Sequence, residues 1–169
     1  VRIVHKTGKD VKPGEVGEII VRGPTLMSGY WNRPDLTAET IRDGWLYTGD
    51  LAKRDEEGYI YIVDRESDMY ISGGENVYPA EIEKLFFTHP KILDVGVVGV
   101  PDKKWGEVGK AYIILKPGET MTEEEALKFL RGKIGKYKIP KHAEFVEELP
   151  KTASGKIQKF LLKEWHKIG

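Results

Sequence analysis

The sequence contains no cysteine, so it can form neither a disulfide nor a thiolate metal site within itself. Its histidines are too scattered along the chain for the ligand spacing of a metal site. No apolar stretch approaches the roughly 20 residues of a membrane-spanning helix, and no signal peptide opens the chain. We therefore expect no metal held by this chain alone and no membrane span. The histidines are His5, His89, His142 and His166.

The sequence also has no net charge, because 27 Lys and Arg residues balance 27 Asp and Glu residues. A balanced chain has no long-range field to attract a nucleic acid or an anionic membrane, so we expect neither partner. What is present is an ordinary globular composition, 40% hydrophobic and 32% charged over 169 residues. This length allows one compact domain or two small ones. We expect a cytoplasmic protein.

The pattern of apolar residues changes at residues 64–68. Before this segment, short apolar runs separated by turn residues predict strands. After it, predicted strands alternate with predicted helices. We therefore predict an α+β protein, with a small β-rich subdomain over residues 1–64 and a second domain over residues 65–169 in which helices flank a short mixed sheet.

Local signals define the predicted elements. Asp35 or Thr37 is the expected N-cap of the first helix, and Thr122 of a later one. Pro79 suits the first turn of another helix. The turn 55–58 ends in Gly58, where a positive φ is needed. The predicted strands are 1–5, 17–22, 45–54, 59–63, 92–100, 110–115 and 143–146, and the predicted helices are 34–42, 80–88, 123–133 and 156–167.

Two runs about a hundred positions apart indicate nucleotide chemistry. The run 150–156 (Pro-Lys-Thr-Ala-Ser-Gly-Lys) ends in Lys156, a point charge with three donors that suits a carboxylate or phosphate oxygen. The run 47–50 (Tyr-Thr-Gly-Asp) ends in Asp50, interpreted as lying at a Thr-Gly turn, whose two carboxylate oxygens can accept from both hydroxyls of a ribose. A P-loop is excluded, because Pro150 occupies the position of its first glycine. Taken alone, Lys156 is equally consistent with a surface lysine, and Asp50 with a turn carboxylate.

Between these runs lies the polar segment 64–83. Arg65 follows a predicted strand and opens a charged stretch, which also suits a solvated surface. Gly73 and Gly74 allow positive φ and a close approach of the backbone to a ligand. A plain hairpin turn would have the same pair of glycines.

The runs 47–50, 64–83 and 150–156, in this order, resemble the AMP-forming acyl-CoA synthetases. That superfamily also contains luciferases and the adenylation domains of peptide synthetases. The resemblance covers essentially the whole chain. Members begin with a large N-terminal lobe that carries a phosphate loop and an adenine-binding segment, and neither is found here. The chain therefore looks like the last third of such an enzyme.

The resemblance implies a role for each residue. Asp50 would hold the ribose hydroxyls of ATP or of the acyl-adenylate, and Arg65 would approach the ribose and phosphate beside a hinge near residues 64–68. Lys156 would be the catalytic residue, bridging the substrate carboxylate and the α-phosphate. Gly73 and Gly74 would line the passage of the CoA thiol in the second step. The residues 65–169 would be a mobile cap.

The activity implied is that of an ATP-dependent ligase that converts a carboxylic acid, fatty or aryl, into an acyl-adenylate and then an acyl-CoA. ATP or AMP, coenzyme A and Mg²⁺ would all require the missing N-terminal lobe, the expected partner. We expect the isolated chain to be inactive. Two alternatives remain open, a complementing or regulatory module without enzymatic activity and an adenylation domain of a peptide synthetase. The loop 100–107 is interpreted as structural.

Overall fold

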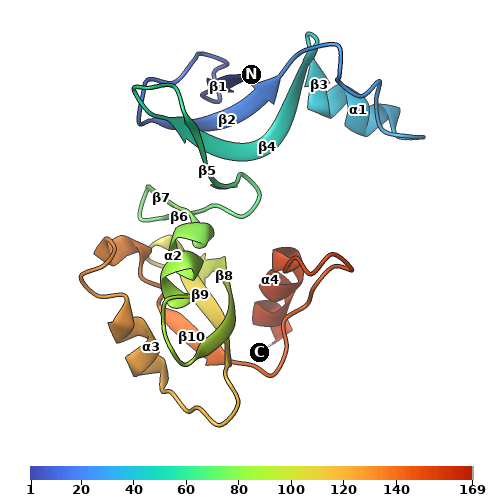
Figure 1. The fold of residues 1–169 in the computed structure, drawn as a ribbon. Coiled ribbons are helices and arrows are strands. Elements are labelled where there is room, and N and C mark those ends of the chain that lie inside the picture. The colour runs from blue at the N-terminus through green and yellow to red at the C-terminus, as the bar shows by residue number, and fades with distance from the viewer. Residues whose placement is uncertain (169) are drawn as a thin grey trace. The chain divides into compact units, whose positions relative to one another are not determined.

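The computed structural model describes residues 1–168, with side chains as far as residue 166. The chain divides into two compact units, Val1–Ser67 and Asp68–Gly169 (Figure 1). The division falls in the segment 64–68, where the sequence changes pattern. The boundary after residue 64 and the hinge stay predictions. Along the described part of the chain, no helix has both the length and the apolar content to cross a bilayer.

The first unit is an antiparallel sheet built around its longest strand, β4. Strand β4 pairs with β2, with β3 and with β5, and β1 extends the sheet beyond β2. Its small buried core includes Ile20 and Leu51, which face inward from neighbouring strands. The strands are β1 (Arg2–Val4), β2 (Val16–Val21), β3 (Ile41–Arg42), β4 (Trp45–Arg54) and β5 (Ile60–Arg65).

Helix α1 (Pro34–Thr40) is shorter than predicted and is not capped as predicted. Its N-cap is Arg33, and no side chain caps it. The hydroxyl of Thr37 instead donates to the carbonyl of Arg33 and accepts the backbone N–H of Tyr30. The expected helical residues 41–42 form β3, because a two-residue turn with positive φ at Asp43 and Gly44 returns the chain into β4.

The second unit is a mixed sheet around β9, as the sequence predicted. Strand β8 runs antiparallel to β9 along its whole length, whereas β10 is parallel to β9. The hairpin of β6 and β7 joins the same sheet where Ser72 pairs with Gly106. The strands are β6 (Tyr70–Ser72), β7 (Glu75–Val77), β8 (Ile92–Asp102), β9 (Gly106–Leu115) and β10 (His142–Phe145).

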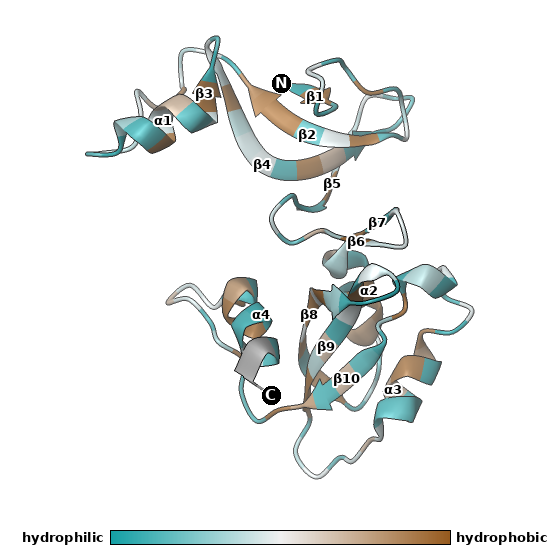
Figure 2. Ribbon diagram, turned by 180° about the vertical axis from the view of Figure 1, so that it is seen from behind, coloured by the Kyte–Doolittle hydropathy of each residue, from teal (hydrophilic) through white to brown (hydrophobic). Residues whose placement is uncertain are grey.

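Helices cover both faces of this sheet. Along β8, Val95 and Val97 pack into one buried cluster, while Val98 and Val100 pack into a second. Because side chains alternate along a strand, a run that is apolar at every position must bury both faces. Helices α2 (Pro79–Phe86) and α3 (Glu123–Phe129) supply the first cluster, and α4 (Lys159–Ile168) supplies the second. Figures 1 and 2 show α4 on the opposite side of the sheet from α2 and α3. The α+β prediction is confirmed.

Several predicted element ends are wrong. Helix α3 has the expected capping box at Thr122 but ends at Phe129, because Gly132 has φ +78° and Arg131 bridges to Ile134. Helix α4 begins at Lys159 rather than at residue 156. The segment 100–107 is a continuation of β8 and β9 joined by a tight turn over residues 103–105, rather than an open loop. A short 3₁₀ helix, Lys136–Lys138, precedes β10.

Candidate functional site

The run 47–50 lies inside strand β4 and is not a turn, contrary to the sequence interpretation. The register pairs Glu18 with Leu51 and Ile20 with Tyr47, so one residue of β2 opposes three of β4. The extra residues are the motif itself, and Gly49 absorbs the distortion with φ +72°. The run is therefore a bulge in the sheet, and a bulge redirects the side chains that it carries.

Backbone groups released by the bulge are satisfied locally. The N–H of Gly49 donates to the Glu18 carboxylate at 2.9 Å, and its carbonyl accepts the N–H of Glu66 at 2.8 Å. The hydroxyl of Thr48 donates to the carbonyl of Ile19 at 2.8 Å and accepts the N–H of Asp50 at 3.1 Å. These bonds hold the backbone from Thr48 to the N–H of Asp50 and so restrict where the Asp50 side chain leaves the strand.

The structure brings Asp50 and Arg65 together. They are register partners across β4 and β5, and the Nε of Arg65 lies 3.1 Å from a carboxylate oxygen of Asp50. The side chains are 35% exposed for Asp50 and 63% exposed for Arg65, so both can reach a ligand. Arg65 ends β5, and two further residues, Glu66 and Ser67, complete the first unit. An acceptor pair and a guanidinium side by side suit a ribose and an adjoining phosphate.

Gly73 and Gly74 form the turn of the β6–β7 hairpin, with φ +60° and +88°. The N–H of Gly73 donates to the carbonyl of Trp105 at 2.9 Å. A Cβ on Gly73 would lie 2.8 Å from the ring of Trp105, whereas a Cβ on Gly74 would meet nothing within 4 Å. Gly73 is therefore required by packing, and Gly74 leaves an open, exposed backbone.

Lys156 lies in an ordered loop that precedes α4. The loop folds back on itself, because Thr152 donates its N–H to the carbonyl of Lys156 at 2.8 Å and accepts the N–H of Lys156 on its hydroxyl at 3.2 Å. Its base is held by an ion pair of 2.6 Å between Lys151 and Asp94 of β8. Lys156 itself is exposed. The loop thus presents the ammonium group to solvent from a fixed backbone.

The structure does not bring Lys156 close to the glycine pair. Figures 1 and 2 both show the β6–β7 hairpin on one side of the second unit and the loop before α4 on the other. The two predicted functional features therefore belong to different surfaces of one unit. Among the described residues, no group of three or more histidines, cysteines or carboxylates is placed to hold a metal ion.

Sequence reasoning missed two residues that hold the candidate site. Glu18 accepts the N–H of Gly49, and Asp102 accepts the N–H groups of Lys104 and Trp105 at 2.8 and 2.9 Å. An aspartate that opens a tight polar turn is a known local signal, which the segment 100–107 contains. Glu18 had no such signal, because its partner is thirty-one residues away in the sequence.

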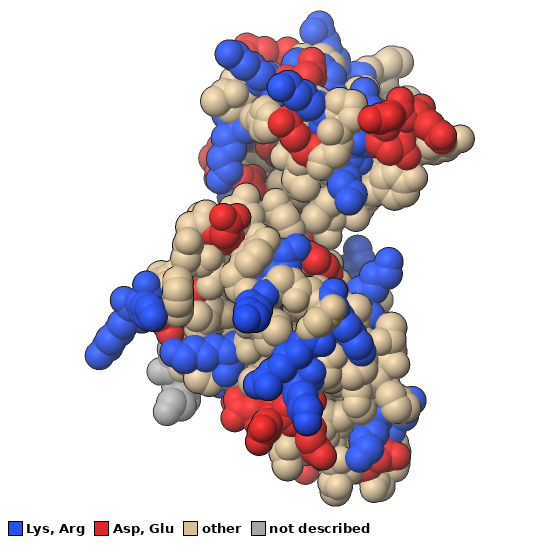
Figure 3. Space-filling view, turned by 90° about the vertical axis from the view of Figure 1, so that its left-hand side faces the viewer, with Lys and Arg blue, Asp and Glu red and all other residues tan. Residues whose placement is uncertain are grey.

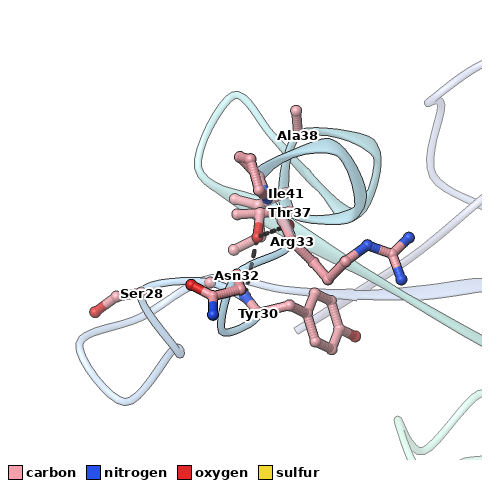
Figure 4. A pocket seen from close by; sticks show the side chains of 9 residues that line it. Ser28, Tyr30, Asn32, Arg33, Thr37, Ala38 and Ile41 are labelled. Carbon is pink, nitrogen blue, oxygen red and sulfur yellow. Dashed lines mark hydrogen bonds between the residues drawn. The ribbon is translucent and has the colours of Figure 1, made fainter.

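A surface pocket of about 530 Å³ lies beside α1 in the first unit (Figure 4). Figure 4 shows the Thr37 hydroxyl at its floor, bonded to the backbone of Tyr30 and Arg33. Its lining contains neither Asp50 nor Arg65. The pocket is thus separate from the candidate nucleotide site.

Comparison with known proteins agrees with this arrangement. Residues 81–156 match the family of AMP-binding enzyme C-terminal domains. The chain is 50% identical over 159 residues to a feruloyl-CoA synthase of an Amycolatopsis species, covering 94% of this chain and 32% of the relative. It is 53% identical over 154 residues to a 2-succinylbenzoate–CoA ligase of Bacillus cereus, covering 91% of this chain and 32% of the relative.

Solved structures give the same result. ATP-bound MatB of Rhodopseudomonas palustris has a TM-score of 0.91 and 40% identity, over 98% of this chain and 33% of that one. The o-succinylbenzoate CoA synthetase of Bacillus subtilis, in complex with its acyl-adenylate intermediate, has a TM-score of 0.89 and 41% identity, over 96% of this chain and 33% of that one. The chain spans about a third of the length of the curated relatives it matches. It belongs to the adenylate-forming superfamily and corresponds to the C-terminal part of AMP-forming acyl-CoA ligases.

Proposed function

We propose that this chain is the part of an ATP-dependent acid–CoA ligase that carries half of the nucleotide site and the cap that acts in both steps. The observation that supports this most directly is the exposure of Lys156 and of the Gly73–Gly74 turn on opposite sides of one unit. The first step would join the acid to the α-phosphate of ATP with release of pyrophosphate. The second would transfer the acyl group to CoA with release of AMP.

In the first unit, Asp50 would accept hydrogen bonds from the ribose hydroxyls, because an ionised carboxylate offers acceptors only. Arg65, 3.1 Å away, would donate to the ribose and the phosphate. The bulge that contains Asp50 supports this role, since its backbone is held at Gly49 and Thr48 before any ligand binds. A carboxylate already aimed loses little freedom on binding.

In the second unit, Lys156 would stabilise the negative charge that builds up as the carboxylate oxygen attacks phosphorus. Its ammonium group forms no ion pair with any side chain that the structure describes, so it is available to a ligand. The hydrogen bonds of the loop keep the backbone of Lys156 in place. Lys156 would thus be the catalytic residue of adenylate formation.

The Gly73–Gly74 turn would line the passage of the CoA thiol. Figure 3 shows Lys and Arg side chains gathered on the side of the second unit that carries this hairpin. Lys104 lies 4.7 Å above the ring of Trp105, which contacts Gly73, and Lys141 is 55% exposed beside Asp102. Lysine side chains at such a surface suit the phosphates of CoA. The same surface would therefore bind the nucleotide part of CoA while the turn admits its thiol.

We propose that a rotation about residues 64–68 presents the two surfaces in turn to one bound adenylate. A hinge needs only a few residues that can absorb a backbone rotation. Such an exchange lets one cap serve two reactions that need different groups at the same atoms. The boundary between Ser67 and Asp68 supports this position for the hinge.

The N-terminal lobe would cover β5. This strand exposes successive apolar side chains, with Ile60, Tyr61 and Ile62 at 38%, 51% and 63% exposure. Because successive side chains point to opposite faces, both faces of the strand are uncovered. A stretch of this kind marks a contact surface, and about two thirds of the length of the curated relatives lies outside this chain. The isolated chain would then lack ligase activity.

The acid would be one that carries an aromatic ring rather than a fatty acid. The relatives named above are a feruloyl-CoA synthase and a 2-succinylbenzoate–CoA ligase. Both acids carry an aromatic ring. The selecting pocket would belong to the N-terminal lobe, and the described residues of this chain would act on the adenylate and on CoA.

The test separates the two steps in the complete ligase that contains this chain. Lys156→Ala should lower acyl-adenylate formation, followed as pyrophosphate release, by roughly 100-fold or more, as expected for loss of a group that stabilises developing charge. Transfer of a supplied acyl-adenylate to CoA should keep its rate. Lys116→Ala, which removes an exposed lysine from another turn of the same unit, should change neither step.

Equal loss of both steps in Lys156→Ala would contradict the assigned division of labour. The isolated chain offers a second test. It should catalyse no pyrophosphate exchange with aryl or fatty acids, and exchange by the purified chain would overturn the requirement for the N-terminal lobe.

A further inference from the structure

The tight turn between β8 and β9 is held by one carboxylate. One oxygen of Asp102 accepts the N–H groups of Lys104 and Trp105, at 2.8 and 2.9 Å. The other accepts from the ammonium group of Lys141 at 2.7 Å. The Asp102 side chain is only 9% exposed, although Lys141 remains 55% exposed. Both oxygens are thus engaged, and the turn cannot change shape without breaking at least one charge-assisted bond.

The same turn supports the glycine pair. The carbonyl of Trp105 accepts the N–H of Gly73 at 2.9 Å, and Ser72 pairs with Gly106 at the end of the hairpin. The Trp105 ring packs so closely over Gly73 that a single added methyl group would lie 2.8 Å from it. The position of Gly73 therefore depends on Trp105, and that of Trp105 depends on Asp102.

We propose that Asp102 is a positioning residue for thioester formation, which it serves by holding Trp105 against the Gly73–Gly74 turn. The assignment rests on the proposed function of that turn. Asp102 contacts no substrate in this scheme. Its carboxylate fixes the backbone of Lys104 and Trp105. Trp105 then holds the Gly73–Gly74 turn, past which the thiol would move. Misplacement of such a passage by about 1 Å can cost on the order of 100-fold in rate.

A second aspartate at the far end of β8 provides a matched comparison. Asp94 accepts the N–H of Val95 at 2.9 Å and pairs with Lys151 at 2.6 Å, so it too combines a backbone bond with an ion pair to a lysine. Lys151 belongs to the loop of Lys156. Asp94 therefore supports the surface of the first step, as Asp102 supports that of the second.

The experiment uses the complete ligase with Asp102→Ala, Asp102→Asn and Asp94→Ala. Asp102→Ala should lower the rate of acyl transfer from supplied acyl-adenylate to CoA by about 10- to 100-fold. It should leave pyrophosphate release unchanged. Asp102→Asn keeps an oxygen for the two N–H groups and should recover most of the rate. Asp94→Ala should show the reverse pattern, with pyrophosphate release reduced and acyl transfer intact.

Amide hydrogen exchange in this chain by itself gives a readout that does not depend on catalysis. Asp102→Ala should speed exchange at Gly73 and Trp105 by at least about 10-fold, while Val95 keeps its rate. Asp94→Ala should speed exchange at Val95 and leave Gly73 and Trp105 unchanged. Unchanged exchange at Gly73 in Asp102→Ala would overturn the dependence of the turn on Asp102.

Equal losses of both steps in Asp102→Ala, or an unchanged acyl transfer rate, would overturn the positioning role. A wild-type enzyme that forms acyl-adenylate but no CoA thioester would overturn the proposed function, and the role of Asp102 in catalysis with it. In that case the exchange rates would still decide separately whether Asp102 holds the turn.

Discussion

Asp50 and Arg65 face each other as register partners on β4 and β5, and 3.1 Å separates the Arg65 Nε from the Asp50 carboxylate. The two residues are fifteen positions apart, and the hairpin that joins them turns at Asp55–Gly58. The bulge of β4 directs Asp50, and the end of β5 places Arg65 at the boundary of the unit. The pair is therefore built by sheet register together with bulge geometry.

We predict that this pair contributes to nucleotide binding far more than to stability. Ion pairs between exposed side chains contribute less than about 1 kcal/mol, so Asp50→Ala and Arg65→Ala should each change the free energy of unfolding of the chain by no more than that. In the complete ligase, each should raise the KM for ATP by about 10- to 100-fold, since a hydrogen bond to a charged group is worth about 1.5–3 kcal/mol.

The control for this prediction is another exposed pair of the same unit. Arg33 and Asp35 are 2.9 Å apart, with 57% and 66% exposure. Arg33→Ala and Asp35→Ala should match the site variants in their small effect on stability and should leave the KM for ATP unchanged. A comparable rise in KM in these controls would remove the specific role of Asp50 and Arg65.

A second prediction concerns the packing of Gly73. Gly73→Ala should destabilise the second unit because the added methyl group meets the Trp105 ring. In a Trp105→Ala background the same change should cost about 1 kcal/mol less, which a double-mutant cycle measures by denaturant unfolding. Gly74→Ala, which meets nothing within 4 Å, should show no coupling to Trp105→Ala. Equal coupling at both glycines would show that contact with the Trp105 ring does not cause the destabilisation by Gly73→Ala.

A third prediction follows from the charge on Asp102. Lys141 above all, and then the N–H groups of Trp105 and Lys104, lower the pKa of its carboxyl from the ordinary 3.8 to about 2. Because the pKa is lower in the folded state, the stabilisation is complete above about pH 4 and is lost as the pH falls through about 2. The amide shifts of Lys104 and Trp105, followed by NMR, should therefore titrate only in this acidic range.

The matched variant is Lys141→Ala. Removing the ammonium group should raise the midpoint of that titration toward the ordinary value. A wild-type midpoint already near 3.8 would show that Lys141 does not act on Asp102 in solution.

A fourth prediction concerns the buried hydroxyl of Tyr70. The side chain is 1% exposed, and its hydroxyl has no hydrogen-bond partner in the part of the chain that the structure describes. Burial, aided by Glu107, raises the pKa of Tyr70 well above its usual range. Because a buried unpaired hydroxyl costs about 1–3 kcal/mol, Tyr70→Phe should maintain or raise the free energy of unfolding. A loss above about 1 kcal/mol in denaturant unfolding would reveal a partner for the hydroxyl.

A fifth prediction concerns the partly buried ion pair between α4 and α2. Lys159 and Glu83 lie 2.9 Å apart with 11% and 14% exposure, and Glu83 also accepts the N–H of Val97. Lys159→Met would remove the cation that faces Glu83 and Asp68 and should destabilise the second unit by about 3 kcal/mol. Adding Glu83→Gln should restore part of the loss. Additive losses in the double variant would show that the two groups are not coupled.

Sequence alone determined the elements whose cause is local. The apolar run 92–100 predicted the strand that the structure shows as β8, and Thr122 was the predicted N-cap of α3. The ordered motifs also indicated the superfamily before any contact was known. These inferences succeeded because periodicity and capping involve residues that are neighbours in the chain.

Only the tertiary structure decided where the site residues lie. In the sequence Thr48–Asp50 suggests a turn, but pairing with β2 makes it a bulge. Likewise, the helix predicted over residues 34–42 ends before Ile41, because residues 41–42 pair with β4. The dependence of Gly73 on Trp105 and Asp102, and the separation of Lys156 from the glycine turn, arise from strand pairing between segments some thirty or more residues apart. Local sequence does not encode these relationships, because register and packing are settled by the partner strand.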